Sequence, residues 1–275
     1  MSDLQVPRLL LSQVHPLAYA LAVGVYRMRR RARWLAEDMM GKRVACARSP
    51  VRLPVRVKRH QSRLLRQLGT SEMWMQHNKV KNIAIAIRPL DGLLIQPGET
   101  FSFWRRVGRP TPERGFVEGM EISRGEARPG MGGGICQIAS VLHWLVLHSP
   151  LVVTERSIHS YDPFPDNARS IPYGTGCSVF YNYIDFQFCN PTSSTFQIVL
   201  WLSERFLEAE LRASANIEHS YTVVEKDQAF LPLPGRYYRR NSLWRRVCDR
   251  RTGSFVREEL IKRNFVRVKY VPSEM

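Results

Sequence analysis

Hydrophobic residues near the start of the chain recur at the spacing of an α-helix. Leu17, Leu21 and Val25 lie four residues apart, which places them on one helical face. The segment Ser49–Val57 interrupts this pattern with two prolines, so we expect an extended connection there. We therefore predict that residues 1–78 form an N-terminal helical region.

The middle of the chain, residues 79–203, has the pattern of a mixed domain. Lys81–Arg88 is short, β-branched and partly alternating, which is typical of a strand. After Gly134, apolar residues at helical spacing predict a helix that ends near His148, where Ser149-Pro150 follows. Further strands are expected at Leu151–Arg156, Cys177–Phe188, Thr195–Trp201 and Phe206–Leu211.

Alternation of apolar and basic residues marks the last part of the chain, for example across Val266–Val271. This pattern is typical of antiparallel strands with one exposed face, so residues 204–275 are predicted to be a β-rich extension. Together the patterns predict an α+β fold. An N-terminal helical region leads into a mixed domain with one central helix after a glycine-rich loop, and a largely antiparallel sheet follows.

Composition and charge narrow the class of protein and of partner. With 44% hydrophobic and 24% charged residues, the chain is globular and not intrinsically disordered. The formal net charge of +17 favours polyanions, which include nucleic acid, anionic lipid surfaces and nucleotide-linked cell-wall precursors. The five cysteines contain no Cys-x-x-Cys pair, which argues against a zinc ribbon or a thioredoxin-like motif.

The N-terminal sequence does not resemble a signal peptide. The apolar run Leu9–Val25 is interrupted by polar residues and proline, and five arginines follow it between Arg27 and Arg33. We therefore expect a cytoplasmic protein with reduced thiols. The run and the arginines together could form an interfacial membrane anchor, but we favour a helix that packs on the protein and has a solvated basic end.

A glycine-rich turn delivers Cys136 to the start of the predicted central helix. Gly132, Gly133 and Gly134 allow positive φ angles and a close backbone approach. A thiol at a helix N-terminus can have a lowered pKa, so Cys136 is a candidate nucleophile. The alternative is a buried cysteine after a tight packing loop.

A cysteine nucleophile needs a base, and His159 is the candidate base because it follows a strand that leads away from the helix. Asp185 could orient that histidine, and the amide of Gln137 could polarise a carbonyl. Each residue also has a structural alternative: His159 could cap a turn, Asp185 could lie at the edge of a strand, and Gln137 could face solvent.

Other binding chemistries have weaker signals. No Lys-Ser/Thr pair follows the glycines, so the loop is not a phosphate-binding P-loop. His143 and His148 lie five residues apart, which is not metal-binding helical spacing, and we expect neither a metal nor a cofactor. Aromatic residues beside arginines at Phe103–Arg106 suit nucleic acid, but they equally suit strands with a basic face, so we regard nucleic acid as an unlikely partner.

Several motifs follow one another along the chain: Pro97–Phe103, Gly115–Gly119, Gly132–Gln137, Val153–Arg156, His159-Ser160 and Val179–Tyr183 with Asp185. Together they resemble those of the VanW family, and the resemblance spans roughly residues 80–203. The family is associated with glycopeptide resistance, so the resemblance implies an accessory protein of resistance that acts on or binds peptidoglycan precursors. Some related domains are regarded as L,D-transpeptidases. In that case Cys136 would be the nucleophile, His159 the base and Arg156 a substrate-binding residue. The third alternative is a basic, non-catalytic scaffold that docks to an anionic membrane or a resistance enzyme.

Overall fold

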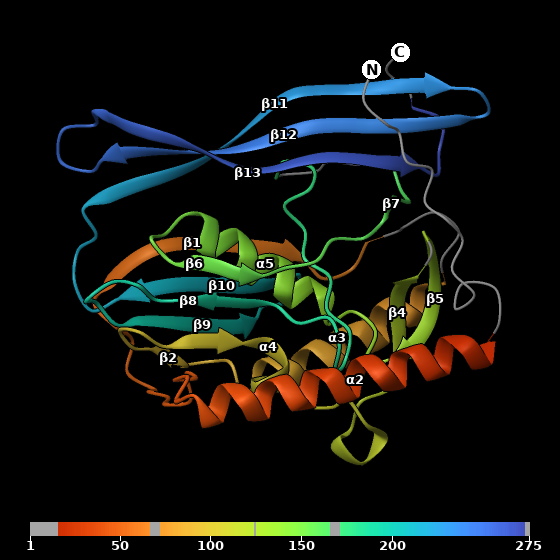
Figure 1. The fold of residues 1–275 in the computed structure, drawn as a ribbon, viewed down its shortest axis with the longest axis horizontal. Helices are drawn as coiled ribbons and strands as arrows, with labels where there is room; N and C mark the ends of the chain where they lie inside the picture. The colour runs from red at the N-terminus through yellow and green to blue at the C-terminus, as the bar shows by residue number, and fades with distance from the viewer. Residues whose placement is uncertain (1–15, 67–71, 124, 166–170, 273–275) are drawn as a thin grey trace.

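The computed structural model describes residues 16–66, 72–123, 125–165 and 171–272 (Figure 1). Its described α-helices lie between Pro16 and Leu147, and its sheets are mostly antiparallel. The α+β fold is confirmed. The helices are α2 (Pro16–Met39), α3 (Met73–Ile87), α4 (Phe103–Val107) and α5 (Cys136–Leu147), with the short 3₁₀ helix η1 (Pro112–Arg114).

The central sheet has four strands in the order β1-β10-β9-β2, all antiparallel. Cross-strand ion pairs accompany the β1–β10 ladder, because Arg56 and Arg59 of β1 meet Glu210 and Glu208 at 3.6 and 3.3 Å. The strands are β1 (Val55–Arg63), β2 (Leu94–Ile95), β9 (Phe196–Leu202) and β10 (Phe206–Ala213).

Two smaller sheets complete the first layer. One has the order β3-β8-β6, and the other is the hairpin β4-β5, which packs against α3. Their strands are β3 (Thr100–Ser102), β4 (Glu118–Ser123), β5 (Glu126–Met131), β6 (Val152–Glu155) and β8 (Gln187–Cys189).

The last part of the chain forms a separate layer beyond α5 (Figure 1). Three long antiparallel strands, β11 (His219–Leu233), β12 (Arg236–Asp249) and β13 (Phe255–Val268), are joined in parallel by β7 (Tyr161–Asp162). The predicted antiparallel C-terminal sheet is confirmed.

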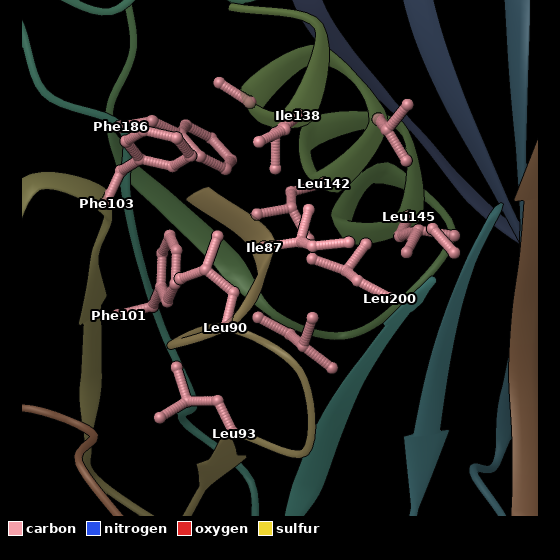
Figure 2. Packing of buried hydrophobic residues seen from close by; sticks show 14 of the residues in the cluster. Ile87, Leu90, Leu93, Phe101, Phe103, Ile138, Leu142, Leu145, Phe186 and Leu200 are labelled. Carbon is pink, nitrogen blue, oxygen red and sulfur yellow. The ribbon is translucent and has the colours of Figure 1, made fainter. Parts of the chain in front are cut away.

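The hydrophobic core lies between α5, the end of α3 and the first-layer strands (Figure 2). Ile138, Leu142 and Leu145 of α5 point into it, and Phe101 stacks on Phe188 with ring centroids 4.7 Å apart. The fully buried members of this cluster all fall between Ala45 and Ala213, so the C-terminal layer contributes none of them.

Several predicted elements are confirmed and three differ. The helix after Gly134 and the strands near Leu151, Thr195 and Phe206 form as expected. Lys81–Arg88, predicted as a strand, belongs to helix α3. The alternation of Ile83 to Ile87 is typical of a strand, but the buried residues of α3 follow helical spacing. They include Gln76 and Asn82, whose side chains contact β4 and the glycine loop and so favour the helix.

Two further segments correct the predictions. Ser49–Val57 is not only a connection, because β1 begins at Val55 directly after Pro54 and continues to Arg63. Cys177–Phe188 is mostly irregular, with isolated bridges at Ser178 and Phe180, because its backbone pairs with side chains of α5 instead of with a strand.

The division into residues 1–78, 79–203 and 204–275 stays a prediction. The central sheet takes β1 from the first region, β2 and β9 from the second and β10 from the third. Residues 9–15 of the predicted apolar run lie outside the described residues. Among the described helices, none has both the length and the apolar composition needed to cross a membrane.

Candidate functional site

Cys136 and Ser140 of α5 bind the backbone of a neighbouring segment, residues 175–179. The Cys136 thiol donates to the Val179 carbonyl and accepts from the Val179 N–H, with Sγ 3.5 Å from each atom. The Ser140 hydroxyl makes the same pair of hydrogen bonds with Cys177, at 3.2 and 2.9 Å. Both side chains thus substitute for the backbone partners that a β-strand would provide.

His143 continues this arrangement one turn further along α5. Its Nδ1 lies 2.7 Å from the Thr175 carbonyl, and burial lowers the pKa of His143 to about 3. The ring is therefore neutral, with Nδ1–H as the donor and Nε2 left as an acceptor. Helix positions 136, 140 and 143 meet alternate residues 179, 177 and 175, and we call this set of contacts the α5 ladder.

The role of Cys136 as a nucleophile stays a prediction, and its surroundings differ from those expected of a reactive thiol. The helix does begin at this residue, as predicted. However, burial raises the pKa of the Cys136 thiol to about 11, because desolvation of a thiolate outweighs the stabilisation from the hydrogen bond with Val179. The thiol is accordingly protonated at neutral pH, and its environment matches the packing alternative.

The structure brings the His159 loop beside the α5 ladder without joining the two residues. Ser178 N–H donates to the Ser157 carbonyl at 2.9 Å, so the loop runs next to residues 175–179. Within the described part of the chain, no hydrogen bond or ion pair connects His159 with Cys136. Burial lowers the pKa of His159, and its role as a base stays a prediction.

Asp185 lies at the start of α4. Its carboxylate is fully buried and accepts hydrogen bonds from Ser102 Oγ at 2.6 Å and from the Trp104 N–H at 3.0 Å. The Phe186 N–H and the Gln187 amide, each at 2.9 Å, supply two more. Burial raises the pKa of Asp185 despite these donors, and the contacts fasten α4 to β8 instead of orienting His159.

The glycines before Cys136 permit close packing. A Cβ on Gly133 would lie 2.1 Å from the Gly119 carbonyl oxygen of β4, and one on Gly134 would lie 1.9 Å from Cγ of Lys79. Gly132 and Gly134 also have positive φ angles of 74° and 99°. The space that a substrate would need beside these glycines is filled by β4 and by Lys79, whose pKa burial lowers to about 8.

Asn82 of α3 fixes this loop, and the sequence analysis did not identify it. Its side-chain amide donates to the carbonyls of Val117 and Gly133, and its oxygen accepts from the Val117 N–H, all at 2.9 Å. Its place directly before the apolar run Ile83–Ile87 gave little signal in the sequence.

Gln137 also has a structural partner. Its amide nitrogen donates to Ser62 Oγ and to the Arg63 carbonyl, both at 2.9 Å, and so joins the first turn of α5 to the end of β1. The side-chain amide of Gln137, which we predicted to polarise a carbonyl, thus donates to β1.

Arg156 lies in a different environment from the other predicted site residues. Its guanidinium donates to the carbonyl of Gly176 at 2.7 Å and to that of Gly174. Among the described residues no carboxylate forms an ion pair with it, and burial lowers its pKa. A half-buried guanidinium whose hydrogen-bond acceptors are neutral carbonyls has its charge incompletely compensated, and this favours an anion nearby.

Arg156 lines a cavity of about 510 Å³ between the two layers, which we call the Arg156 pocket. This volume is within the range of ligand sites, about 300 to 1,000 Å³. One wall is apolar and comes from α5, β6 and β13, whereas the cations are Arg156, Arg245 and Lys262. No carboxylate is among the lining residues, although Arg245 pairs with Glu259 just outside at 2.5 Å.

The sequence analysis missed the contribution of α5 and of the last strands to this pocket. His143 reaches it from the α5 ladder, and Arg245, Leu260 and Lys262 reach it from β12 and β13. The spacing of Cys136, Ser140 and His143 on an otherwise apolar helix could have indicated the ladder. Nothing local to the sequence could indicate that β13 folds over α5.

Comparison with known proteins agrees with the motifs. A family model described as VanW like protein matches residues 78–212. The vancomycin B-type resistance protein VanW of Enterococcus faecalis strain V583 is 30% identical over 199 residues, which is 72% of this chain and 72% of that protein. The uncharacterized protein YoaR of Bacillus subtilis strain 168 is 35% identical over 112 residues, which is 40% of this chain and 34% of YoaR. No solved structure matched significantly. The chain belongs to the VanW family.

Proposed function

We propose that this protein is an accessory of glycopeptide resistance that binds an anionic peptidoglycan precursor in the Arg156 pocket. The relative in Enterococcus faecalis is named as a vancomycin B-type resistance protein, which supports the biological context. The observation that carries the proposal is the pocket itself, where Arg156 and Lys262 face an apolar wall and no carboxylate is among the lining residues.

The chemistry of such a precursor suits both the apolar wall and the cations of the pocket. A muramyl peptide combines carboxylates with small apolar side chains, and its nucleotide-linked form adds a diphosphate. Carboxylates and phosphates are the groups that a guanidinium binds best, and a charge-assisted hydrogen bond contributes about 1.5 to 3 kcal/mol. The pocket volume of about 510 Å³ suits one end of this molecule, so the rest would extend into solvent.

The structure supports a binding function more than an acyl transfer in which Cys136 is the nucleophile. A thioester mechanism starts from a thiolate, whereas burial raises the pKa of Cys136 to about 11. The thiol also has its two hydrogen-bond partners in Val179, and Gln137 donates to β1. These contacts support a structural role for the glycine-cysteine motif, which positions α5 and thereby one wall of the pocket.

The test is calorimetric titration of the full chain with the nucleotide-linked muramyl pentapeptide. We expect Lys262→Gln to weaken binding by about tenfold, which corresponds to about 1.4 kcal/mol. Lys262 is exposed, so its replacement should leave the fold intact. The matched control is Lys81→Gln, which removes an exposed lysine of α3 that does not line the pocket.

The outcomes separate the alternatives. Binding that weakens in Lys262→Gln but not in Lys81→Gln supports the proposal. No detectable binding by the wild-type chain, or equal binding by both variants, rejects it. Acyl transfer to an amine that is lost in Cys136→Ala while binding persists would favour the transpeptidase alternative.

A further inference from the structure

Helix α2 has its polar and apolar faces reversed relative to an ordinary surface helix. Arg30 and Glu37 are only 8% and 7% exposed and lie against the protein. Arg30 donates to Glu155 at 2.6 Å and to the Tyr183 carbonyl at 3.0 Å. Burial opposes the charge of Arg30, yet Glu155 holds the pKa of Arg30 above its ordinary value. The helix is thus attached to the protein by its charged face.

The opposite face of α2 is apolar and exposed along the whole helix. Successive members are separated by three, four or seven residues, which places them on one stripe of a helix. The stripe covers positions 17 to 39, a length of about 33 Å at 1.5 Å per residue. We call it the α2 stripe, and its large members are Leu17 (70% exposed), Leu21 (72%), Val25 (42%), Met28 (62%), Leu35 (63%) and Met39 (81%).

Basic residues flank this stripe. Arg29 and Arg31 are exposed, and within the described part of the chain neither forms an ion pair. The acidic residue nearby, Asp38, is already bound by Arg105 at 2.6 Å. The free charge beside the stripe is therefore positive, in a chain with a formal net charge of +17.

The position of α2 leaves the stripe accessible along its length. The helix runs along the side of the molecule opposite the β11-β12-β13 sheet (Figure 1). A straight helix with an apolar stripe and basic flanks has the features of helices that lie in the plane of a membrane surface. There the apolar residues enter the acyl-chain boundary and the cations meet anionic headgroups.

We propose that α2 docks this protein flat on an anionic membrane surface through the α2 stripe, with Arg29 and Arg31 in contact with lipid phosphates. Charge complementarity favours this occupant over a second copy of the chain. Two stripes packed on each other would bring the four arginines of both copies to the rim of one interface without a neutralising charge, whereas anionic lipid neutralises them.

The test is co-sedimentation of the full chain with vesicles of phosphatidylcholine containing roughly 30% phosphatidylglycerol. The variant Leu21→Gln/Met28→Gln/Leu35→Gln should lose about tenfold or more in the bound fraction, because the apolar contact is removed. The matched control, Val51→Gln/Phe255→Gln/Val271→Gln, removes three equally exposed apolar residues elsewhere and should bind like the wild type.

A second pair of variants tests the charge. Arg29→Gln/Arg31→Gln should abolish the preference for anionic over pure phosphatidylcholine vesicles, while Arg236→Gln/Arg250→Gln, on the C-terminal layer, should retain it. Arg30 is left unchanged because it is buried against Glu155, so its replacement would perturb the fold. Raising the salt concentration should weaken wild-type binding through screening of the same charges.

Two results would overturn the proposal. One is vesicle binding by the triple stripe variant at the wild-type level. The other is a lipid-free dimer in sedimentation velocity that the triple variant converts to a monomer, together with no vesicle binding by the wild type. Thermal unfolding of each variant, followed by circular dichroism, verifies that the fold is retained.

Discussion

Individual side chains in this protein act mainly as substitutes for missing backbone partners. Cys136 and Ser140 each donate and accept with one backbone unit, and Asn82 uses three hydrogen bonds on the glycine loop. Such groups are costly to remove when buried, because their partners are then left unsatisfied. The hydrogen bonds of these polar side chains thus connect neighbouring segments of the chain, whereas Arg156 lines the Arg156 pocket.

The alkylation of the cysteines tests this view at the residue scale. At pH 8, iodoacetamide should modify the exposed Cys46 first and Cys136 much more slowly, because burial raises the pKa of Cys136 to about 11 and little thiolate is present. Peptide mass spectrometry of a time course gives the rate at each site. Modification of Cys136 as fast as Cys46 would contradict a structural thiol and restore the nucleophile hypothesis.

His143 makes stability depend on pH. Burial lowers the pKa of His143 to about 3, so the unfolded chain binds a proton near pH 6.5 while the folded protein does not. Stability should therefore fall as the pH falls from about 6.5 towards 3, by about 2 kcal/mol for this residue between pH 6.5 and 5. Urea unfolding across this range measures the slope.

The control is His143→Gln, which retains a donor for the Thr175 carbonyl but does not titrate. Its slope should be smaller than that of the wild type by close to one proton. His148, whose pKa burial lowers to about 4, contributes to the slope of both proteins. Identical slopes for the two proteins would show that His143 is solvated in the folded state.

At the scale of elements, close approach between α5, β4 and α3 is made possible by glycine. Gly133→Ala places a Cβ 2.1 Å from the Gly119 carbonyl oxygen, a clash between backbones that side-chain movement cannot relieve. We expect a loss of more than about 3 kcal/mol in the free energy of unfolding, or failure to fold. Chemical denaturation of the purified variant measures the loss.

Gly24→Ala is the matched control, because nothing lies within 4 Å of its Cβ and Gly24 is inside helix α2. That change should stabilise the protein by up to about 1 kcal/mol through helix propensity. An equal effect of the two substitutions would mean that the glycine loop is not tightly packed against β4.

At the scale of the whole molecule, the two layers have separate roles. The fully buried members of the main hydrophobic cluster lie between Ala45 and Ala213, whereas the Arg156 pocket takes Arg245, Leu260 and Lys262 from the C-terminal layer. A chain truncated after Ser214 should therefore unfold cooperatively yet lose precursor binding. Calorimetry gives both quantities, and non-cooperative unfolding of the truncated chain would show that the second layer is part of the core.

The sequence by itself determined the elements with strong local signals. The helix after Gly134 and the strands around Thr195, Phe206 and Val266 follow from apolar periodicity, because a partly buried element must present one face to the core. The motifs likewise identified the family. Apolar periodicity also predicted the first part of the α2 stripe, at Leu17, Leu21 and Val25, but not the direction in which it faces.

Tertiary structure decided what periodicity leaves ambiguous. The Ile83–Ile87 run became helical because Asn82 and Lys79 pack on the glycine loop. The Cys136 thiol is hydrogen-bonded because the fold brings Val179 beside it. The reversed orientation of α2 depends on Glu155, more than a hundred residues away. Burial and ion pairing are properties of neighbours in space, so the pKa of a thiol and the exposed face of a helix could be known only from the folded chain.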